Sequence, residues 1–487
     1  MTTPNWVKDA IFYQIFPDRF ARSQQMPDLH FEAWDSAPTH HGFKGGDLYG
    51  VTEKLDYLHD LGINAIYFNP VFASASNHRY HTYDYFNVDP LLGGNDAFRN
   101  LLDAAHKRDI RVVLDGVFNH ASRGLWQFHH VLETGAASPY KDWFFFDPER
   151  LQGRKHWGAY PSPHEQKALQ HEDSVTAIGY KGWWNLPALP KFNTNTPAVR
   201  KFLFDVAEYW TKFGIDGWRL DVPAEIDDDE FWREFRKRVR AINSETYIVG
   251  EIWHEASRWL QGDQFDAVMN YLFTAAALNF FPGEHLKLDI VAQAGGLKDR
   301  VRRMHAPEFA GELDRILHLY PKDHTYAQMN LLDSHDMPRF LSCAGGDRDS
   351  LKLAWLFMFT FPGAPCIYYG DEVGLDGKHD PDCRKSFPWE EARWDRDLLD
   401  HVKACIALRS AHVSLRRGEY KRVYAEGDVM AFSRTFENET VTIAFNASNE
   451  GKAVELPDAK IPEVLFGKPI ISGNKALIPA RSGIVLK

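Results

Sequence analysis

Short runs of hydrophobic residues recur along most of the chain, and amphipathic stretches with helical spacing separate them. The runs are nearly continuous in hydrophobicity, which is typical of parallel strands covered by helices on both faces. They span residues 10–17, 63–70, 111–118, 215–222, 246–253, 265–273, 328–332 and 365–369, and the clearest amphipathic stretches span 96–108, 198–213 and 230–242. Eight strand–helix units predict an α/β fold, a (β/α)8 TIM barrel. An open doubly wound sheet is the competing architecture, but no Gly-x-Gly-x-x-Gly motif follows the first run.

Two segments depart from this alternation. The segment 121–190 follows the third predicted strand and is rich in Trp, Tyr, His, Pro and Gly. Long loops are usually functional, and this one leaves the carboxyl end of a strand, where barrel enzymes carry their active sites. After about residue 413 short alternating runs, such as 429–434 and 440–446, predict an antiparallel β-sandwich. We expect a barrel from residues 1–120 and 191–412, an inserted loop domain at 121–190 and a C-terminal β-sandwich domain at 413–487.

The composition excludes some classes of partner. Hydrophobic residues make up 44% of the chain and charged residues 25%, and the formal net charge is −11 without a long Lys or Arg run. Nucleic-acid binding requires a cationic face, so no nucleic-acid partner is expected. The most apolar stretch, 353–369, is interrupted by Pro362, Gly363 and Pro365. It predicts a buried helix, turn and strand, and no membrane partner.

The cysteines and the first residues indicate a cytoplasmic location. Cys343, Cys366, Cys383 and Cys405 are isolated in the sequence, without a Cys-x-x-Cys pair. They are expected to be free thiols in a reducing compartment. The start of the sequence, MTTPNWVKD, has no cationic region followed by an apolar stretch, so no signal peptide is expected.

Charged residues stand at the ends of several predicted strands. Arg219 and Asp221 are two residues apart and project to the same side of a strand. An arginine beside a carboxylate favours its ionised form, which suits a nucleophile, although a structural ion pair is the alternative. Glu251 has Val, Ile and Trp neighbours. Loss of solvation there should raise the pKa of Glu251 and suit a proton donor.

A third carboxylate follows the seventh predicted strand, at Asp336, so acidic groups from three strands converge on one face. Glycoside hydrolysis requires two carboxyl groups, one that attacks the anomeric carbon and one that protonates the leaving oxygen, about 5–5.5 Å apart in retaining enzymes. His120 and His335 could hydrogen-bond the same sugar ring. Aromatic side chains could stack on sugars or simply pack in the core; they are Tyr80, Trp253, Trp183 and Trp184.

Together these segments resemble the α-amylase family, glycoside hydrolase family 13, and within it the neopullulanase, cyclomaltodextrinase and maltogenic amylase branch. The resemblance extends from about residue 10 to the end of the sequence. The matching stretches are Asp115-Gly-Val-Phe-Asn-His120, Pro190-Lys-Phe-Asn193, Gly217-Trp-Arg-Leu-Asp-Val222, Gly250-Glu-Ile-Trp-His254 and Ser334-His-Asp336.

The resemblance implies a role for each matching residue. Asp221 would be the nucleophile, Glu251 the acid/base and Asp336 the group that stabilises the transition state. Tyr80 would stack on the sugar that is attacked, and Trp253 would lie on the leaving-group side. The full set of substrate-binding residues that the resemblance implies is Tyr80, His120, Arg219, Trp253, His335, Asp380 and Arg384, the last two for the next sugar towards the non-reducing end.

The chain also departs from this branch. Its members usually carry an N-terminal β-domain that helps to form a dimer, whereas a barrel strand is predicted here from residue 10, so a homodimer is left open. Tyr80-His81 replaces the Tyr-Asp pair of the family. Residues 22–35 lack the Asn/Asp-rich pattern that binds calcium in relatives, although Gly45 and Asp47 match part of that site. We therefore expect no required metal and no other cofactor, and leave open whether a calcium ion that is not required binds near Asp47.

The leading hypothesis is a retaining hydrolase of α-1,4 and α-1,6 glucosidic bonds in maltooligosaccharides, cyclodextrins, pullulan or branched α-glucans. A transglycosylase would use the same residues, with a sugar hydroxyl in place of water. A non-catalytic glycan-binding barrel is disfavoured because all three carboxylates are present. A metal-dependent hydrolase would use His120, His335, Asp221 and Asp336 as ligands, but no His-x-x-x-His type of spacing supports it.

Overall fold

A closed parallel barrel forms the centre of the protein. The structure is a computed structural model that describes residues 3–153, 157–455, 462–472 and 475–487. Its main sheet has eight parallel strands in the order β8-β7-β6-β5-β2-β1-β10-β9. A parallel bridge between Met269 and Met329 joins the two outer strands, and the Asn270 N–H donates to the Met329 carbonyl at 2.8 Å. The predicted TIM barrel is confirmed.

The barrel strands are short and almost entirely buried. They are β1 (Phe12–Ile15), β2 (Ala65–Phe68), β5 (Arg111–Gly116), β6 (Gly217–Leu220), β7 (Tyr247–Gly250), β8 (Ala267–Val268), β9 (Met329–Leu331) and β10 (Ala364–Tyr368). Each lies inside one of the eight hydrophobic runs, except that β10 begins one residue before its run. Burial on both faces explains why the runs show no alternation of polar and apolar residues.

The run at 265–273 contains less strand than expected. Strand β8 has two residues, and helix α11 (Tyr271–Phe280) begins almost directly after it. The Asn270 side chain caps this helix by accepting a hydrogen bond from the Phe273 N–H at 3.2 Å. Because strand and helix are both fully buried, hydrophobicity continues across the boundary and could not locate it.

Helices cover the outside of the barrel, as predicted. The three amphipathic stretches form α4 (Gly94–His106), α9 (Pro197–Phe213) and α10 (Asp229–Ile242). The stretch 353–369 holds the end of α16 (Arg348–Thr360), a turn and β10. The remaining helices outside the inserted segment are α1 (Pro17–Phe20), α2 (Leu48–Glu53), α3 (Leu55–Leu61), α12 (Leu288–Val291), α13 (Ala306–His318), α14 (Lys322–Ala327), α15 (Phe340–Cys343), α17 (Arg396–Ala411) and α18 (Val413–Arg417). None of the helices in the described residues is long and apolar enough to cross a membrane.

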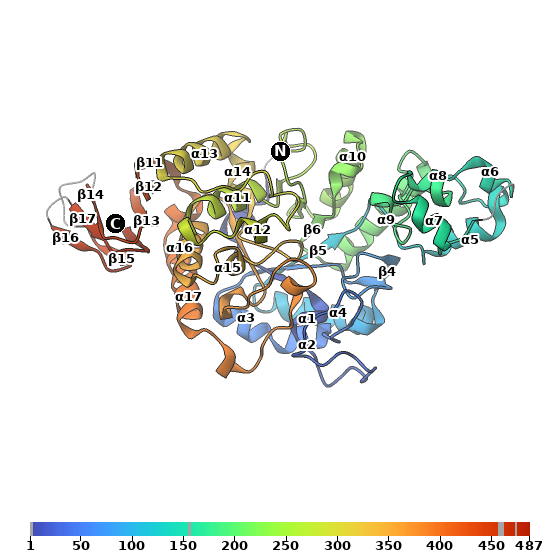
Figure 1. The fold of residues 1–487 in the computed structure, drawn as a ribbon, viewed down its shortest axis with the longest axis horizontal. Coiled ribbons are helices and arrows are strands. Elements are labelled where there is room, and N and C mark those ends of the chain that lie inside the picture. Colours follow the sequence, from blue (N-terminus) through green and yellow to red (C-terminus); the bar gives the residue numbers. More distant parts are fainter. Residues whose placement is uncertain (1–2, 154–156, 456–461, 473–474) are drawn as a thin grey trace.

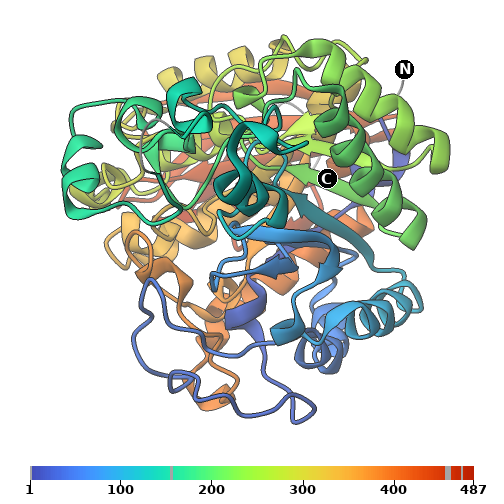
Figure 2. The same cartoon turned by 90° about the vertical axis from the view of Figure 1, so that its right-hand side faces the viewer.

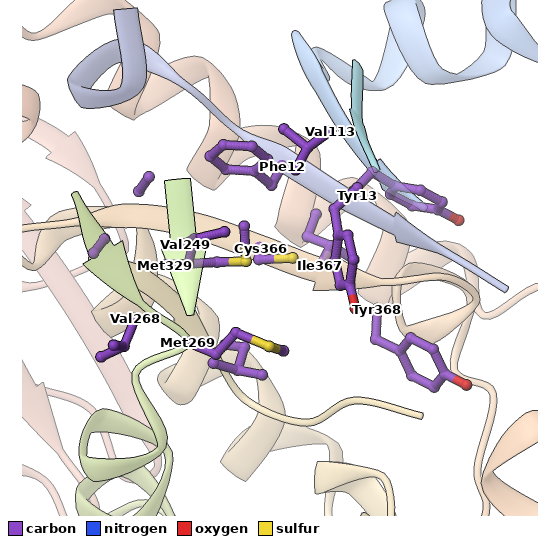
Figure 3. Packing of buried hydrophobic residues seen from close by; sticks show 14 of the residues in the cluster. Phe12, Tyr13, Val113, Val249, Val268, Met269, Met329, Cys366, Ile367 and Tyr368 are labelled. Atoms are coloured by element: carbon purple, nitrogen blue, oxygen red, sulfur yellow. The ribbon is translucent and has the colours of Figure 1, made fainter. Parts of the chain in front are cut away.

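Side chains fill the inside of the barrel. Phe12 stacks on Tyr247 with ring centroids 5.8 Å apart. Figure 3 shows Val249, Met329 and Cys366 among the strands, each almost inaccessible to solvent. The barrel is therefore a packed core, and chemistry is confined to its ends. All four cysteines are free and buried, as predicted.

The inserted segment and the C-terminal sheets lie at opposite ends of the molecule (Figure 1). The segment 121–190 contains α5 (Trp126–Thr134), α6 (Pro148–Leu151), α7 (Pro163–Ala168) and α8 (Ser174–Ile178). Seen from its own end, it lies in front of the barrel (Figure 2). The hairpin of β3 (Phe72–Ser74) and β4 (Thr82–Val88) adjoins it, because the Ser122 N–H donates to the Thr82 carbonyl at 2.8 Å.

The C-terminal part forms two antiparallel sheets, in agreement with the predicted β-sandwich. One sheet has the order β11-β12-β13-β18-β15 and the other the order β14-β17-β16. Their strands are β11 (Glu419–Glu426), β12 (Val429–Phe436), β13 (Glu439–Asn446), β14 (Lys452–Glu455), β15 (Val464–Phe466), β16 (Ile470–Ser472), β17 (Lys475–Ile478) and β18 (Ser482–Leu486). The exact domain boundaries stay a prediction.

A buried arginine joins the barrel to the segment that leads into these sheets. Arg409 on α17 is fully buried, and its guanidinium donates to the carbonyls of Phe359 at 3.1 Å, Leu415 at 3.1 Å and Gly363 at 2.6 Å. These carbonyls have no solvent to replace a lost donor. The arginine therefore stabilises the end of α16 against α17 and α18.

Arg409→Met should destabilise the protein while preserving side-chain length. Each buried carbonyl left without a donor costs about 1–3 kcal/mol. We expect a clearly lower melting temperature in differential scanning calorimetry. Arg99→Met is the matched control, because Arg99 is 43% exposed. Equal melting temperatures of the two variants would contradict the assignment.

Candidate active site

A buried guanidinium lies at the carboxyl ends of β5, β6 and β7. Arg219 Nη1 contacts both carboxylate oxygens of Asp115 at 2.9 Å and Asp221 Oδ1 at 3.0 Å. Its other terminal nitrogen, Nη2, pairs with Glu251 Oε2 at 3.0 Å. Arg219 is fully buried, Asp221 is 7% exposed and Glu251 5% exposed. One cation thus holds three acidic side chains from three neighbouring strands.

Strand register produces this arrangement. Asp115 on β5 is directly opposite Arg219 on β6, and Arg219 is opposite Val249 on β7. Residues two positions apart on a strand face the same side, so Asp221 and Glu251 continue inward beyond Arg219 and Val249. The predicted projection of Arg219 and Asp221 to one side is confirmed by their direct contact.

A strained turn brings Asp221 and Glu251 together. Val222 has φ 36° and ψ 50°, a left-handed conformation that is rare for a β-branched residue. Such strain costs about 1–3 kcal/mol and persists only when surrounding contacts hold it. Here the turn directs the Val222 N–H to Glu251 Oε2 at 3.1 Å. The backbone next to Asp221 therefore positions the Glu251 carboxylate.

The other side of Glu251 contacts an aromatic side chain. Trp253 Nε1 donates to Glu251 Oε1 at 3.0 Å. The Trp253 ring stacks on Tyr271, with centroids 3.6 Å apart and an interplanar angle of 7°. The indole is therefore fixed in orientation, and it holds the second oxygen of Glu251.

A second chain of contacts runs from Asp115 to the loops after β9 and β10. The Tyr80 hydroxyl donates to Asp115 Oδ2 at 2.8 Å and lies 2.8 Å from His335 Nε2. His335 Nε2 also pairs with Asp336 Oδ2 at 2.9 Å. Asp336 is 35% exposed, so it borders solvent.

Arg384 extends this chain outward. It donates to Asp336 Oδ1 at 3.1 Å and pairs with Asp380 Oδ1 at 2.9 Å. The structure therefore connects nine of the ten predicted site residues through direct side-chain contacts, by way of Asp115. His120, the tenth, has no side-chain hydrogen bond to the other nine in the described residues.

His120 is a neutral, buried group. Burial lowers the pKa of His120 to about 3, so it is uncharged near pH 7. The Asn119 side-chain amide lies 3.3 Å from its Nδ1. Its ring stacks on Trp183 of the inserted segment, with centroids 4.7 Å apart. His120 thus joins the barrel end to that segment.

Negative charge exceeds positive charge around Arg219. Burial raises the pKa of Asp115, Asp221 and Glu251, and Arg219 opposes the rise only in part because it serves all three. The predicted upward shift of the Glu251 pKa is confirmed. Arg219 lowers the pKa of Asp221, as expected, but burial and the neighbouring carboxylates outweigh this effect, so the net shift is upward.

The outer carboxylate behaves differently. Burial raises the pKa of Asp336, but His335 and Arg384 outweigh this effect and hold it below its ordinary value. Asp336 therefore stays ionised, and its charge adds to the rise in the pKa of both Asp221 and Glu251. The inner carboxyl groups, in contrast, have raised pKa values.

Sequence reasoning missed several residues that support these groups. Asp115 was noted only as part of a matching stretch, yet it holds Arg219 from the opposite side. The Tyr67 hydroxyl donates to Asp115 Oδ2 at 3.0 Å, and Gln14 Nε2 lies 3.0 Å from both His335 Nδ1 and Asn69 Oδ1. In the sequence these residues could have been recognised as polar residues inside or next to otherwise apolar strand runs.

The geometry does not favour a metal at this site. His335 faces Gln14 through Nδ1 and both Tyr80 and Asp336 through Nε2, so both ring nitrogens have partners. In the described part of the chain no three His, Cys, Asp or Glu side chains are grouped in a way that could hold a metal ion. Acid–base chemistry between carboxyl groups fits the arrangement better.

Comparisons with known proteins agree with this geometry. The chain matches the model of the alpha amylase catalytic domain over residues 14–411 and that of the alpha-amylase C-terminal domain over residues 418–465. It is 45% identical to a cyclomaltodextrinase of Geobacillus thermopakistaniensis, covering 93% of this chain and 71% of the relative. It is 43% identical to neopullulanase 2 of Thermoactinomyces vulgaris, covering 99% and 75%. The solved structure of a Nostoc punctiforme debranching enzyme superposes with a TM-score of 0.87 at 45% identity, covering 100% and 99%.

The region around Gly45 and Asp47, which the sequence resemblance compared with part of a calcium site, is closed by hydrogen bonds in this chain. Asp47 caps α2 by accepting the Gly50 N–H at 2.8 Å, and its other oxygen accepts the Ser23 N–H at 2.8 Å. The Gly45 N–H donates to Asp18 Oδ1 at 3.2 Å. Both oxygens of Asp47 are therefore committed to the backbone.

Two side-chain cations occupy the neighbouring loop. The Lys44 ammonium is fully buried and donates to the carbonyls of Ala33 at 2.7 Å and Ser36 at 2.8 Å. Arg22 Nε donates to the Lys44 carbonyl at 3.1 Å. Calcium requires six to eight oxygen ligands, and these oxygens already have donors. The residues present do not fit a calcium ion.

Chelation should therefore leave the protein unchanged. We expect the same melting temperature and the same turnover before and after dialysis against EDTA. Lys44→Met, in contrast, should lower the melting temperature, because each carbonyl left unpaired costs about 1–3 kcal/mol. Lys201→Met is the control, since Lys201 is 74% exposed. A melting temperature that falls with EDTA and recovers with calcium would contradict the conclusion that these residues do not fit a calcium ion.

Proposed function

This chain belongs to the α-amylase family of glycoside hydrolases, and we propose that it cleaves α-1,4 and α-1,6 glucosidic bonds with retention of anomeric configuration. The proposed substrates are maltooligosaccharides, cyclodextrins, pullulan and branched α-glucans. The observation that carries the proposal is the pairing of Asp221 and Glu251 with the same buried guanidinium, Arg219. Retaining enzymes place two carboxyl groups beside the scissile bond, and contact with a common guanidinium keeps these two side chains close together.

In the proposed reaction Asp221 is the nucleophile. A carboxylate oxygen of Asp221 attacks the anomeric carbon while Glu251 gives its proton to the glycosidic oxygen, and the leaving sugar departs with that proton. Glu251 then takes a proton from water, and the resulting hydroxide attacks the anomeric carbon and releases Asp221. Buried Asp221 Oδ2, which has no hydrogen-bond partner in the described residues, supports the role of a poorly solvated, reactive carboxylate.

For this reaction Asp221 has to be ionised and Glu251 has to carry a proton. Burial raises the pKa of both Asp221 and Glu251, and the charge of Glu251 adds to the rise at Asp221. Positive charge that develops on the attacked sugar lies next to Asp221 and stabilises its ionised form. Bound substrate therefore favours the protonation state in which Asp221 is ionised and Glu251 carries the proton.

The remaining residues bind and orient the sugar. Asp336, ionised and at the solvent border, would stabilise the transition state and bind hydroxyl groups together with His335 and neutral His120. Tyr80 would present its ring to the attacked sugar. Asp380 and Arg384 would bind the next sugar. We also propose a cytoplasmic location, which the four buried free thiols support.

Removing the nucleophile should abolish turnover. For Asp221→Asn we expect kcat on β-cyclodextrin and pullulan to fall by at least about 10³-fold, because no covalent intermediate can form. Glu251→Gln should have a similar effect. Asp60→Asn is the control, since Asp60 is 79% exposed. Undiminished turnover in Asp221→Asn, at an unchanged melting temperature, would refute the assignment.

Trp253→Phe should shift the pH profile upward on its basic side. The Trp253 N–H stabilises the ionised form of Glu251 and lowers its pKa, against the larger effect of burial. Phenylalanine keeps an aromatic ring against Tyr271 but removes the donor, so the pKa of Glu251 should rise. The protonated acid then persists to higher pH, and the basic limb of kcat/KM moves to higher pH. A basic limb that stays in place or moves down would refute the role of Glu251 as acid.

A further inference from the structure

Three aromatic rings form a continuous stack that starts at the end of the barrel. His120, which follows β5, stacks on Trp183 with centroids 4.7 Å apart and planes 10° apart. Trp183 stacks on Trp184 with centroids 4.6 Å apart and planes 19° apart. Trp183 and Trp184 belong to the inserted segment, which lies in front of the barrel in Figure 2. The stack therefore leads outward from a residue of the candidate active site.

The outermost ring is open to solvent. Trp184 is 74% exposed, the largest exposed fraction among the large hydrophobic side chains of the described residues. Its inner face is covered by Trp183, so the other face is a flat apolar surface. Such a face is available for contact with an apolar surface of a ligand.

The backbone holds Trp184 in this position at an energetic cost. Trp184 has φ 51° and ψ 33°, and the next residue, Asn185, has φ 58°. Left-handed conformations at two successive non-glycine residues are strained and persist only when other contacts impose them. The Asn185 side chain supplies these contacts, because Oδ1 accepts the Ser174 N–H at 3.1 Å and Nδ2 donates to the Glu172 carbonyl at 3.2 Å. A strained and clamped aromatic residue is characteristic of a binding site.

A second exposed tryptophan in the same segment shows the contrast. Trp126 is 56% exposed but meets His130 and Tyr140 edge to face, at interplanar angles of 81° and 79°. It has ordinary helical surroundings as the first residue of α5 and no ring contact with His120. Exposure alone therefore does not distinguish Trp184; the stack and the strained backbone do.

We propose that Trp184 is a substrate-binding residue whose exposed indole face stacks on a glucosyl unit of the α-glucan outside the unit that is attacked. A pyranose ring has an apolar face of C–H groups that matches an indole in size, and its hydroxyl groups remain in water at the edge. The stack is continuous with His120, so a glucan chain that leaves the attacked sugar can reach it. This inference rests on the proposed function, because it assigns an additional binding position to the same site.

The test compares Trp184→Ala with Trp126→Ala, which removes an exposed indole from the same segment. The readout is the ratio of kcat/KM for maltohexaose to kcat/KM for maltotriose. For Trp184→Ala we expect this ratio to fall by about 10-fold, because a lost aromatic stacking contact weakens binding of the longer chain. Trp184→Phe should retain most of the ratio, and Trp126→Ala should match the unchanged enzyme.

Binding without turnover separates this inference from the proposed function. Calorimetric titration of maltohexaose should give a Kd about 10-fold higher for Asp221→Asn with Trp184→Ala than for Asp221→Asn alone. The inference is overturned if the Trp184→Ala ratio equals that of Trp126→Ala. It is also overturned if the variant only changes self-association in gel filtration while its glucan Kd stays constant. Wild-type protein inactive on every α-glucan would instead refute the proposed function, and the titration would still report on Trp184.

Discussion

The structure of the site depends on one buried cation held among acidic side chains. Arg219 has no access to solvent, so its charge must be balanced by protein groups. Asp115, Asp221 and Glu251 provide that balance from three consecutive strands of the barrel, at 2.9–3.0 Å. A shift in strand register would leave a charge buried without a partner. The same requirement therefore stabilises the register of β5, β6 and β7 and keeps the Asp221 and Glu251 carboxyl groups on one guanidinium.

Competition for this cation determines where protons are held. Asp336 has His335 and Arg384 as separate positive or donating neighbours and remains ionised. The inner carboxyl groups share Arg219 and bind protons more tightly than ordinary carboxyl groups. Unequal access to positive charge thus separates the pKa of the outer carboxylate, which is lowered, from the pKa values of the inner carboxyl groups, which are raised. Trp253 and the Val222 N–H adjust this balance at Glu251 through direct hydrogen bonds.

The inserted segment contacts the barrel end through aromatic rings, in contrast to the ion pairs around Arg219. Its connection to the barrel end includes the ring stack of His120 and Trp183, in addition to backbone bridges such as that between His120 and Lys191. The barrel end carries the charged groups of the proposed reaction, whereas the segment carries exposed aromatic surface. That division is physically reasonable, because bond cleavage requires electrostatic stabilisation and retention of a long neutral chain requires apolar contact.

The sequence by itself was sufficient for the barrel, the C-terminal sheets and the acidic residues at the strand ends. Strand runs are local patterns, and residues such as Asp221, Glu251 and Asp336 stand out because they directly follow apolar runs. Three features could not be obtained in this way: the length of β8, the pKa of Asp221 and the closure of the loop around Asp47. Each depends on contacts between residues that are distant in the sequence, such as Asp115 with Arg219 or Ser23 with Asp47. Local sequence patterns indicate which residues are buried. Only the packed structure determines which side chains form ion pairs, hydrogen bonds or ring stacks, because these interactions depend on distances of a few ångströms.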